Sequence, residues 1–299
     1  MLIRSLVNLA LSVSAAATLA GCQGGVLDPK GQVGIDEKYL IIVATILMLL
    51  VVLPVIAMTI YFAWKYRDGR DHEIYLPKWS HSKKIETVVW VVPIVIILVL
   101  GTITWRSTHA LDPYKPLDSD QPHLTVEVVS LNWKWLFIYP EQGIASVNEL
   151  VFPANVPVEF KITSDTTMNS FFIPQLGSQI YSMAGMETKL HLIANEAGTF
   201  DGISANYSGE GFSGMKFKAI ATPSCAGFDD WVAQVRGSAG GLDLAAYRRL
   251  AEPSEHHPVE HYGRVDTGLF HHIVMQYMKD HHITGASGHT AQHHGEAGE

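Results

Sequence analysis

Two long apolar segments lie in the first third of the chain. Residues 40–63 and 87–105 are almost entirely aliphatic or aromatic, and each is long enough, at about 1.5 Å per residue, to cross roughly 30 Å of hydrocarbon as a helix. Pro54 and Pro93 lie inside them, which membrane helices tolerate when neighbouring helices satisfy the freed carbonyls. Aromatic residues suited to the membrane–water interface accompany the segments: Tyr61, Trp64, Tyr66, Trp90 and Trp105. The pattern predicts two transmembrane helices within residues 39–106.

The apolar pattern changes twice after these segments. Residues 107–122 are rich in proline and aspartate, which is typical of a linker. In residues 123–223, short apolar runs alternate with polar positions or are split by proline, and roughly 100 residues of such strands predict a β-sandwich. In residues 224–282 apolar side chains recur at helical spacing, interrupted at Pro253 and Pro258, and a C-terminal helical extension is predicted.

The last residues, 283–299, are rich in glycine, alanine and histidine and show no apolar periodicity, so they predict a disordered tail. Several histidines in or next to this tail could bind a divalent metal ion loosely: His281, His282, His289, His293 and His294. A solvated tail is the favoured interpretation, because no fixed geometry would hold these side chains around an ion.

The start of the chain has the pattern of a secretion signal. Arg4 precedes a mostly apolar run and then small residues, and Leu19-Ala20-Gly21-Cys22 resembles the cleavage pattern of bacterial lipoproteins. Removal of residues 1–21 would leave Cys22 as a lipidated N-terminus; the alternative is an uncleaved signal anchor. Cys225 is the other of the two cysteines, so lipidation of Cys22 would leave no pair for an intramolecular disulfide.

Charge sets the expected orientation. The segment between the two apolar helices, residues 64–86, is rich in lysine and arginine, whereas residues 22–38 hold only Lys30 and Lys38. The positive-inside rule therefore predicts a cytoplasmic loop, with the N-terminal segment and the C-terminus both in the periplasm. The formal net charge of -8 gives no basic footprint for nucleic acid, and the chain has no phosphate-binding glycine loop, nucleophile elbow or HExxH helix.

The most informative stretch is residues 199–217, TFDGISANYSGEGFSGMKF. Its glycines and serines suit a tight loop, and residues 186–193 and 215–221 on either side are rich in β-forming residues, so a loop between two strands is predicted. Cupredoxins hold copper in such loops, with thiolate and imidazole ligands. No cysteine or histidine lies between residues 199 and 217.

This stretch resembles the ligand loop of subunit II of the haem-copper oxidases, whose cytochrome c-oxidising members bind a binuclear copper centre. The family pattern is one histidine, then Cys-x-Glu-x-Cys-x3-His-x2-Met. Without gaps, its positions fall here on Asn169, Ser204, Asn206, Ser208, Phe212 and Met215. Only Met215 keeps the family identity, and hydroxyl, amide and phenyl groups cannot replace bridging thiolates. Together with GEGFSGMKFKAIATP, the stretch resembles the quinol-oxidising branch, the bo-type ubiquinol oxidases, over about residues 19–278.

The resemblance implies an α+β membrane protein: a two-helix transmembrane hairpin followed by a periplasmic cupredoxin-like β-sandwich and a C-terminal helical extension. It implies a non-redox subunit, lipid-anchored in the bacterial inner membrane, of a proton-pumping enzyme that oxidises ubiquinol and reduces oxygen to water. Haem b, haem o or a, and copper are expected in the catalytic subunit I, with subunits III and IV and membrane lipids as further partners. Ubiquinol would be bound by the complex, and cytochrome c would not be a partner. The haem types, and ubiquinol against menaquinol, stay open.

Two other functions compete with this one. A copper-containing subunit of a cytochrome c oxidase would carry electrons, but Ser204, Ser208 and Phe212 argue against it. A free-standing lipoprotein that sequesters periplasmic metal through its histidine-rich tail is opposed by the two predicted spans. A mononuclear copper site built from Asn169, Met183, Met186 and Met215 is disfavoured too, because the predicted sandwich has no thiolate.

Two further motifs have competing interpretations. Glu86 lies where the second apolar segment meets the cytoplasmic side and resembles the subunit II glutamate at the mouth of the family's K proton channel; alternatively it is a solvated acid at a helix start. Trp133-Lys134-Trp135 resembles the aromatic cluster that lies between donor and copper in the cytochrome c branch. Because Trp133 and Trp135 lie two residues apart, which in a strand places both on one face, packing in the core or against another subunit is predicted instead.

Overall fold

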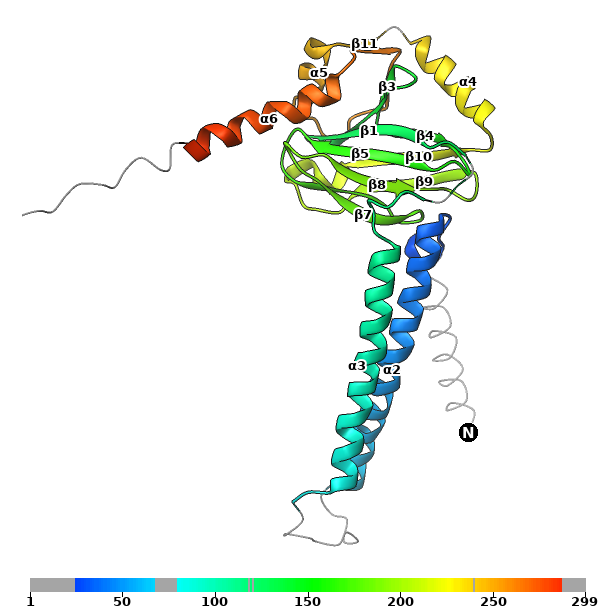
Figure 1. The fold of residues 1–299 in the computed structure, drawn as a ribbon, viewed down its shortest axis with the longest axis vertical. Helices are drawn as coiled ribbons and strands as arrows, with labels where there is room; N and C mark the ends of the chain where they lie inside the picture. Colours follow the sequence, from blue (N-terminus) through cyan, green and yellow to red (C-terminus); the bar gives the residue numbers. More distant parts are fainter. Residues whose placement is uncertain (1–24, 68–79, 118, 120, 239, 287–299) are drawn as a thin grey trace, which may run out of the picture. The chain divides into compact units, whose positions relative to one another are not determined.

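The computed structural model describes residues 25–67, 80–117, 119, 121–238 and 240–286. It divides into two compact units, one formed by residues 36–112 and the other containing all the described strands. The predicted fold class is confirmed, because two long apolar helices, a β-sandwich and C-terminal helices follow one another along the chain (Figure 1). The side of the membrane on which the sandwich lies stays a prediction.

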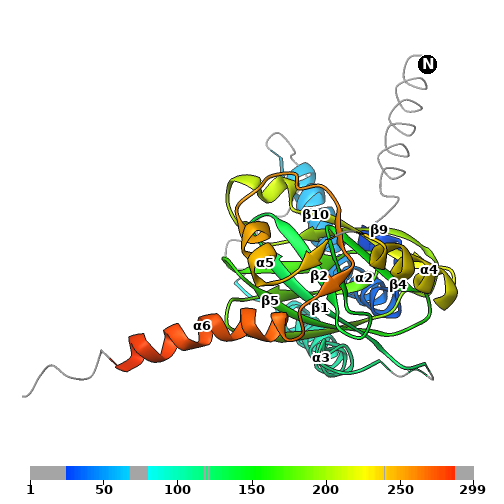
Figure 2. The same cartoon turned by 90° about the horizontal axis from the view of Figure 1, so that it is seen from above.

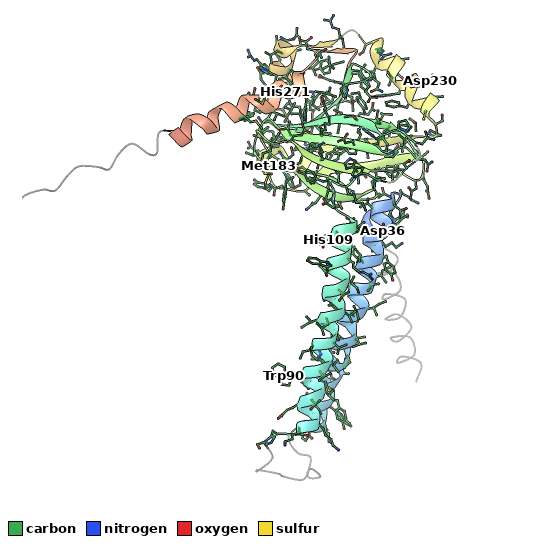
Figure 3. The ribbon with its side chains drawn as sticks, in the orientation of Figure 1. Asp36, Trp90, His109, Met183, Asp230 and His271 are labelled. Carbon is green, nitrogen blue, oxygen red and sulfur yellow. The ribbon has the colours of Figure 1, made fainter. Side chains whose placement is uncertain are left out.

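The first unit is a helical hairpin. Helix α2 spans Gln32–Lys65, with residue 36 onward in this unit, and helix α3 spans Lys83–Ala110, so both are longer than the apolar segments that predict them. A short 3₁₀ turn, η1 (Gly25–Leu27), precedes α2 and belongs to the other unit. Both are long and apolar enough to cross a membrane, and no residue in the most apolar window of either helix is buried. Figure 3 shows the side chains of Trp90 and His109 projecting outward from α3. Such exposed apolar surface requires lipid or other apolar partners.

Two sheets form the sandwich. The six-stranded sheet has the order β12-β3-β2-β1-β5-β8 and the five-stranded sheet the order β4-β10-β9-β6-β7. Strands β1–β5 and β4–β10 pair parallel, and the other pairs within these two sheets are antiparallel. The strands of the first sheet are β1 (Leu124–Leu131), β2 (Lys134–Tyr139), β3 (Ile144–Val147), β5 (Val158–Ser164), β8 (Thr188–Leu192) and β12 (Glu260–Tyr262). Those of the second are β4 (Glu149–Pro153), β6 (Asn169–Ile173), β7 (Gly177–Ser182), β9 (Gly198–Ser204) and β10 (Lys216–Thr222).

An aromatic core fills the space between the sheets. The rings of Trp135 and Phe171 meet edge to face at 5.4 Å, and Phe171 stacks on Phe217 at 5.2 Å between centroids. Gly202 belongs to this core: a Cβ there would lie 2.1 Å from the ring of Phe217. The prediction of a loop from residue 199 onward is therefore wrong over residues 199–204, which form strand β9. Gly202 makes room for a neighbouring ring rather than for a turn.

The C-terminal extension covers the opposite face of the six-stranded sheet. Helices α4 (Cys225–Arg236), α5 (Leu244–Ala251) and α6 (Leu269–Ala286) follow the sandwich, with a two-stranded sheet of β11 (Gly241–Leu242) and β13 (Arg264–Val265) between them (Figures 1 and 2). A second apolar core forms there, and we call its sheet side the covered face: Val129, Leu131, Leu136, Ile138, Ala145 and Val147, against Leu242, Tyr247, Leu250, Leu269, Phe270, Ile273 and Val274. Every residue of β2 is buried as a result, which explains its continuous apolar run.

Two features near the ends of the described chain add to what the sequence predicts. Helix α6 continues to Ala286, past the predicted boundary at residue 282, and the rest of the tail, with His289, His293 and His294, lies outside the described residues. Near the N-terminus, residues 30–34 form a strap that binds the sandwich. The backbone N–H of Gly31 donates to the Gln175 carbonyl at 3.2 Å, and that of Gly34 to the Leu176 carbonyl at 3.0 Å.

Candidate functional site: a ligand loop held by hydrogen bonds

The loop that follows β9, residues 205–215, is short and closed by a 3₁₀ turn, η2 (Glu210–Gly214). The N–H of Phe212 donates to the Gly209 carbonyl at 3.2 Å, and the N–H of Met215 to the Phe212 carbonyl at 3.1 Å. Ser204 N–H donates to the Met215 carbonyl at 3.3 Å, which closes the base of the loop. Met215 is almost fully buried, at 1% exposure, so the one position that keeps the family identity serves the core.

Three of the positions matched to family ligands meet in one hydrogen-bonded cluster. The Ser204 hydroxyl donates to Asn169 Oδ1 at 3.0 Å, and the Asn169 amide donates to the Thr167 carbonyl at 3.1 Å. Asn206 joins them, because its carbonyl lies 3.3 Å from the Ser204 hydroxyl and its side-chain amide donates to the Met168 carbonyl at 3.1 Å. Asn169 and Ser204 are both buried. A buried polar cluster of this kind is stable because its members satisfy one another.

The two remaining positions contact other residues. The carbonyl of Ser208 accepts a hydrogen bond from Trp133 Nε1 at 3.1 Å, and the buried Ser208 hydroxyl has no partner in the described part of the chain. The Phe212 ring packs edge to face on Tyr207, with centroids 5.6 Å apart. Tyr207 is 76% exposed, so this aromatic pair lies at the surface of the loop.

These donors do not fit a binuclear copper centre. The centre needs thiolate bridges and imidazoles, whereas the matched positions offer hydroxyls, amides, a phenyl ring and a thioether. In addition, the side chains of Asn169, Ser204 and Asn206 are already engaged with one another or with backbone carbonyls. Among the described residues, no group of three or more His, Cys, Asp or Glu side chains is arranged to hold a metal ion.

The placement of Trp133 corrects the prediction that both tryptophans share one face. Strand β1 ends at Leu131 and β2 begins at Lys134, so Trp133 lies in the turn between them, in the left-handed region at φ 63°. Its ring packs on the ligand loop, because a Cβ on Gly211 would lie 2.5 Å from its Cδ2. Trp135, by contrast, is fully buried in the aromatic core. The turn breaks the alternation that the prediction assumes.

Lys134, between the two tryptophans, binds a segment far away in sequence. We call residues 252–259, between α5 and β12, the connector. Lys134 Nζ donates to the Glu252 carbonyl at 2.8 Å and to the Ser254 hydroxyl, which lies 3.0 Å from His257 Nδ1. Burial lowers the pKa of Lys134, and burial together with the Lys134 charge lowers the pKa of His257, while Glu260 opposes both shifts. Sequence reasoning treats the connector only as a helix break and misses this contact.

A second polar contact holds the helices of the extension. The Asp165 carboxylate, in the turn after β5, accepts hydrogen bonds from the hydroxyl of Tyr247 at 2.5 Å and from the hydroxyl of Tyr277 at 2.8 Å. Gln276 donates a third at 2.5 Å. Burial, and then the Asp165 charge, raises the pKa of Tyr247 far above its ordinary value, so this hydroxyl stays a donor. An aspartate four residues before the matched Asn169 is the only sequence signal for this contact.

Two predicted sites receive less structural information. Glu86 is exposed in the first turn of α3, where its N–H donates to the Ser82 carbonyl at 2.9 Å. An exposed acid at the start of a helix is compatible with proton entry and with a merely solvated side chain, so the proton-entry role stays a prediction. Cys22 lies outside the described residues, so its lipidation also stays a prediction. Cys225 is an exposed free thiol at the start of α4.

Comparison with known proteins finds similar family models, solved structures and curated relatives. Residues 236–281, from the end of α4 into α6, match the family model "COX Aromatic Rich Motif". Among solved structures, a similar one is the periplasmic domain of subunit II of the Bradyrhizobium japonicum cytochrome oxidase. The similarity covers 40% of this chain and 96% of that domain, at 22% identity and a TM-score of 0.37.

Two curated relatives match most of the chain. "Cytochrome bo(3) ubiquinol oxidase subunit 2" of Pseudomonas aeruginosa is 62% identical over 272 residues, covering 91% of this chain and 81% of the relative. "Ubiquinol oxidase subunit 2" of Acetobacter aceti is 55% identical over 267 residues, covering 89% and 86%. The chain belongs to the family of ubiquinol oxidase subunit 2, and the resemblance found in the sequence is confirmed.

Proposed function

We propose that this chain is the non-redox subunit II of a proton-pumping quinol oxidase of the bacterial inner membrane. Its family membership makes it a subunit of a ubiquinol oxidase, an oxidoreductase of the haem-copper oxidase family. Haem b, haem o or a, and copper belong to the catalytic subunit I in this proposal, beside subunits III and IV. The chain supports the complex structurally, and electrons pass from ubiquinol to oxygen without entering the sandwich.

The observation that carries the proposal is the cluster of Asn169, Ser204 and Asn206. These residues occupy three of the positions where the family's copper-binding members have ligands, and their side chains are satisfied by hydrogen bonds. A site of this composition supplies no thiolate to bridge two copper ions. An electron donor that needs such a centre, as cytochrome c does in the copper-containing branch, has no acceptor here.

The test is made on the intact complex, purified from its native membrane in mild detergent. We expect co-purifying haem, oxygen consumption driven by quinol, and no oxygen consumption driven by reduced cytochrome c. Copper analysis should account for the catalytic subunit alone, with no purple absorption from this chain. Oxidation of cytochrome c, or stoichiometric copper in this chain, would contradict the proposal.

Proton entry at Glu86 is a separate part of the proposal. A carboxylate at the membrane boundary, near His81, Lys83 and Lys84 in the sequence, can collect protons for uptake. Glu86→Gln should lower oxygen consumption per haem several-fold without loss of assembly. Glu141→Gln, in the exposed turn between β2 and β3, is the matched control and should leave turnover unchanged. Equal turnover of the Glu86 variant and the parent complex would remove the idea.

Lipidation of Cys22 is tested by mass. The purified chain should lack residues 1–21 and carry the added mass of a lipid on Cys22. Cys22→Ala should abolish this added mass, whereas Cys225→Ala should leave it unchanged, because Cys225 is a free thiol outside the signal. We expect the Cys22 variant to remain in the membrane through α2 and α3. A parent chain with an intact, unmodified N-terminus would contradict this part.

A further inference from the structure

Three consecutive residues on the turn into β2 reach three different parts of the molecule. Trp133 packs on the ligand loop, Lys134 binds the connector, and Trp135 fills the aromatic core. An uninterrupted strand would place the first and third on the same face. The left-handed turn at Trp133 separates them, and it does so with a bulky side chain in a region that such residues rarely adopt.

The contacts of Trp133 with the ligand loop explain this conformation. A bulky residue at positive φ is strained and persists only where its surroundings fix it. Its indole N–H binds the Ser208 carbonyl at 3.1 Å, and its ring lies where a side chain on Gly211 would be, 2.5 Å from an added Cβ. A Cβ added to Gly209 would lie 3.5 Å from Cζ2 of the same indole ring, so Gly209 also contacts it. The glycines of the loop therefore form a surface for this ring.

The connector contacts the other end of the same loop. His256, also at positive φ, lies against Gly214, where an added Cβ would be 2.9 Å from its Cε1 and Nδ1. The indole holds the loop at residues 208–211 and the imidazole holds it at residue 214. The loop thus has two side-chain supports, one from the β1–β2 turn and one from the C-terminal extension.

The two supports are joined to each other through β2. Lys134 Nζ binds the Glu252 carbonyl and the Ser254 hydroxyl, which fixes the connector next to the turn. Asn148 makes the second tie: its Oδ1 accepts the Trp135 N–H at 2.9 Å, and its Nδ2 donates to the His257 carbonyl at 2.8 Å. Ser254 and His257 lie on either side of His256 in the connector. Both are therefore anchored to the start of β2, Ser254 by Lys134 and His257 through Asn148.

We propose that Trp133, Lys134, Asn148 and His256 form a brace through which the C-terminal extension fixes the ligand loop. In family members whose loop carries the copper ligands, the bound metal would fix the loop instead. Metal binding orders the residues that supply its ligands. Here the order comes from an indole, an imidazole and the connector that Lys134 and Asn148 hold. The inference rests on the proposed function, because it assumes a loop without metal.

The decisive variant is Lys134→Met, because the hydrogen bonds of the Lys134 ammonium go to the connector, at Glu252 and Ser254, and not to the ligand loop. Hydrogen–deuterium exchange is measured on the intact complex for the amides of residues 205–214 and of the connector. If the brace acts as one unit, releasing the connector frees His256 from Gly214, and loop amides should exchange faster by on the order of tenfold. Lys189→Met, on β8 of the same sheet, is the matched control and should leave both segments unchanged.

Trp133→Gly is the second variant, since glycine accepts the left-handed turn while the ring is removed. It should accelerate exchange at residues 208–211 more than at residue 214, with the amides of β1 and β5 unchanged. Faster exchange in the connector alone, for Lys134→Met, would overturn the brace. So would unchanged loop exchange in Trp133→Gly.

Copper analysis of the same samples distinguishes failure of the brace from failure of the proposed function. Copper bound in the loop of the parent complex would contradict the proposed function, whatever the exchange shows. If the loop binds no copper and its amide exchange is unchanged in Lys134→Met, the brace is refuted while the proposed function stands.

Discussion

The covered face of the six-stranded sheet and the ligand loop are stabilised in different ways. The covered face is a contiguous apolar surface packed against the extension, with Leu136, Ile138 and Ile273 among its buried side chains. The loop is held by backbone hydrogen bonds, the Asn169–Ser204 pair and two rings packed on glycines. Apolar area contributes most to the free energy of unfolding, whereas a few polar contacts fix a local shape. Substitutions on the face should therefore change global stability, and substitutions near the loop should change local order.

The largest effect is expected for Phe270→Ala. Phe270 is 4% exposed in the core between α6 and the covered face, so its removal leaves a cavity that should cost about 3–5 kcal/mol. The midpoint of thermal unfolding of the purified complex should fall by several degrees. Val259→Ala, at a residue that is 47% exposed, is the control and should have little effect. Equal midpoints for the two variants would show that the extension adds no stability to the sheet.

Asp165→Asn tests the polar link between the extension and the turn after β5. The charged acceptor of Tyr247 and Tyr277 is lost, and weakening these hydrogen bonds should cost about 2–3 kcal/mol. Chemical denaturation of the complex, followed by tyrosine fluorescence, should show the lower midpoint. Combining it with Tyr247→Phe should give less than the sum of the two single effects, because both remove one interaction. Strict additivity would mean that the carboxylate and this hydroxyl do not cooperate.

The pH dependence of the connector is expected to be smaller. Burial and the neighbouring Lys134 charge lower the pKa of His257 below its ordinary value of 6.5, although Glu260 opposes the shift. The unfolded chain therefore binds this proton more readily, so the contribution of the neutral ring is complete above about pH 6.5 and is lost as the pH falls below it. With partial exposure the effect should stay under about 1 kcal/mol. His257→Gln should flatten the pH profile of connector exchange between pH 5 and about 7.

The smallest effect is expected for Glu127→Gln, at the edge of the covered face. Burial raises the pKa of Glu127 from 4.5 to about 6, Lys161 opposes the shift and Glu187 adds to it. The folded protein holds this proton more tightly, so stability falls as the pH rises from 4.5 to about 6 and stays lower above it. The variant should be slightly more stable than the parent at pH 7.5, by under about 1 kcal/mol after solvent screening, and equal to it near pH 4. A destabilised variant at pH 7.5 would contradict this sign.

The helical hairpin, the sandwich and the extension follow from the apolar pattern, because period and length decide which element can bury its side chains. The continuous run of β2 even reflects its burial on both faces. The predictions for Gly202 and Trp133 fail for one reason, which is that contacts with distant residues override a local rule. Glycine is expected in turns, but Gly202 makes room for a ring; strand alternation is expected to set the faces, but Trp133 lies in a left-handed turn. The matched ligand positions follow from the resemblance to the family pattern, and the structure brings three of them together.

What sequence reasoning misses is the set of polar contacts between distant segments. Lys134 and Glu252 are 118 positions apart, and Asp165 and Tyr277 are 112 positions apart. Their local surroundings do not identify the partner in either pair, because the partners meet only when the extension returns to the sheet. A buried lysine needs a partner, but the burial of Lys134 is seen only in the structure.

The strap at residues 30–34 has a consequence for the order in which the protein can be made. Its binding surface is supplied by Gln175, Leu176 and Ala194, and the nearby contact between Asp28 and Gln175 spans 147 positions. The ribosome must therefore finish most of the sandwich before the strap has anything to bind, although the strap itself is synthesised first. Closing so long a loop is entropically costly, which places this contact late in folding. Nascent chains arrested before residue 194 should expose the strap to protease, and longer ones should protect it.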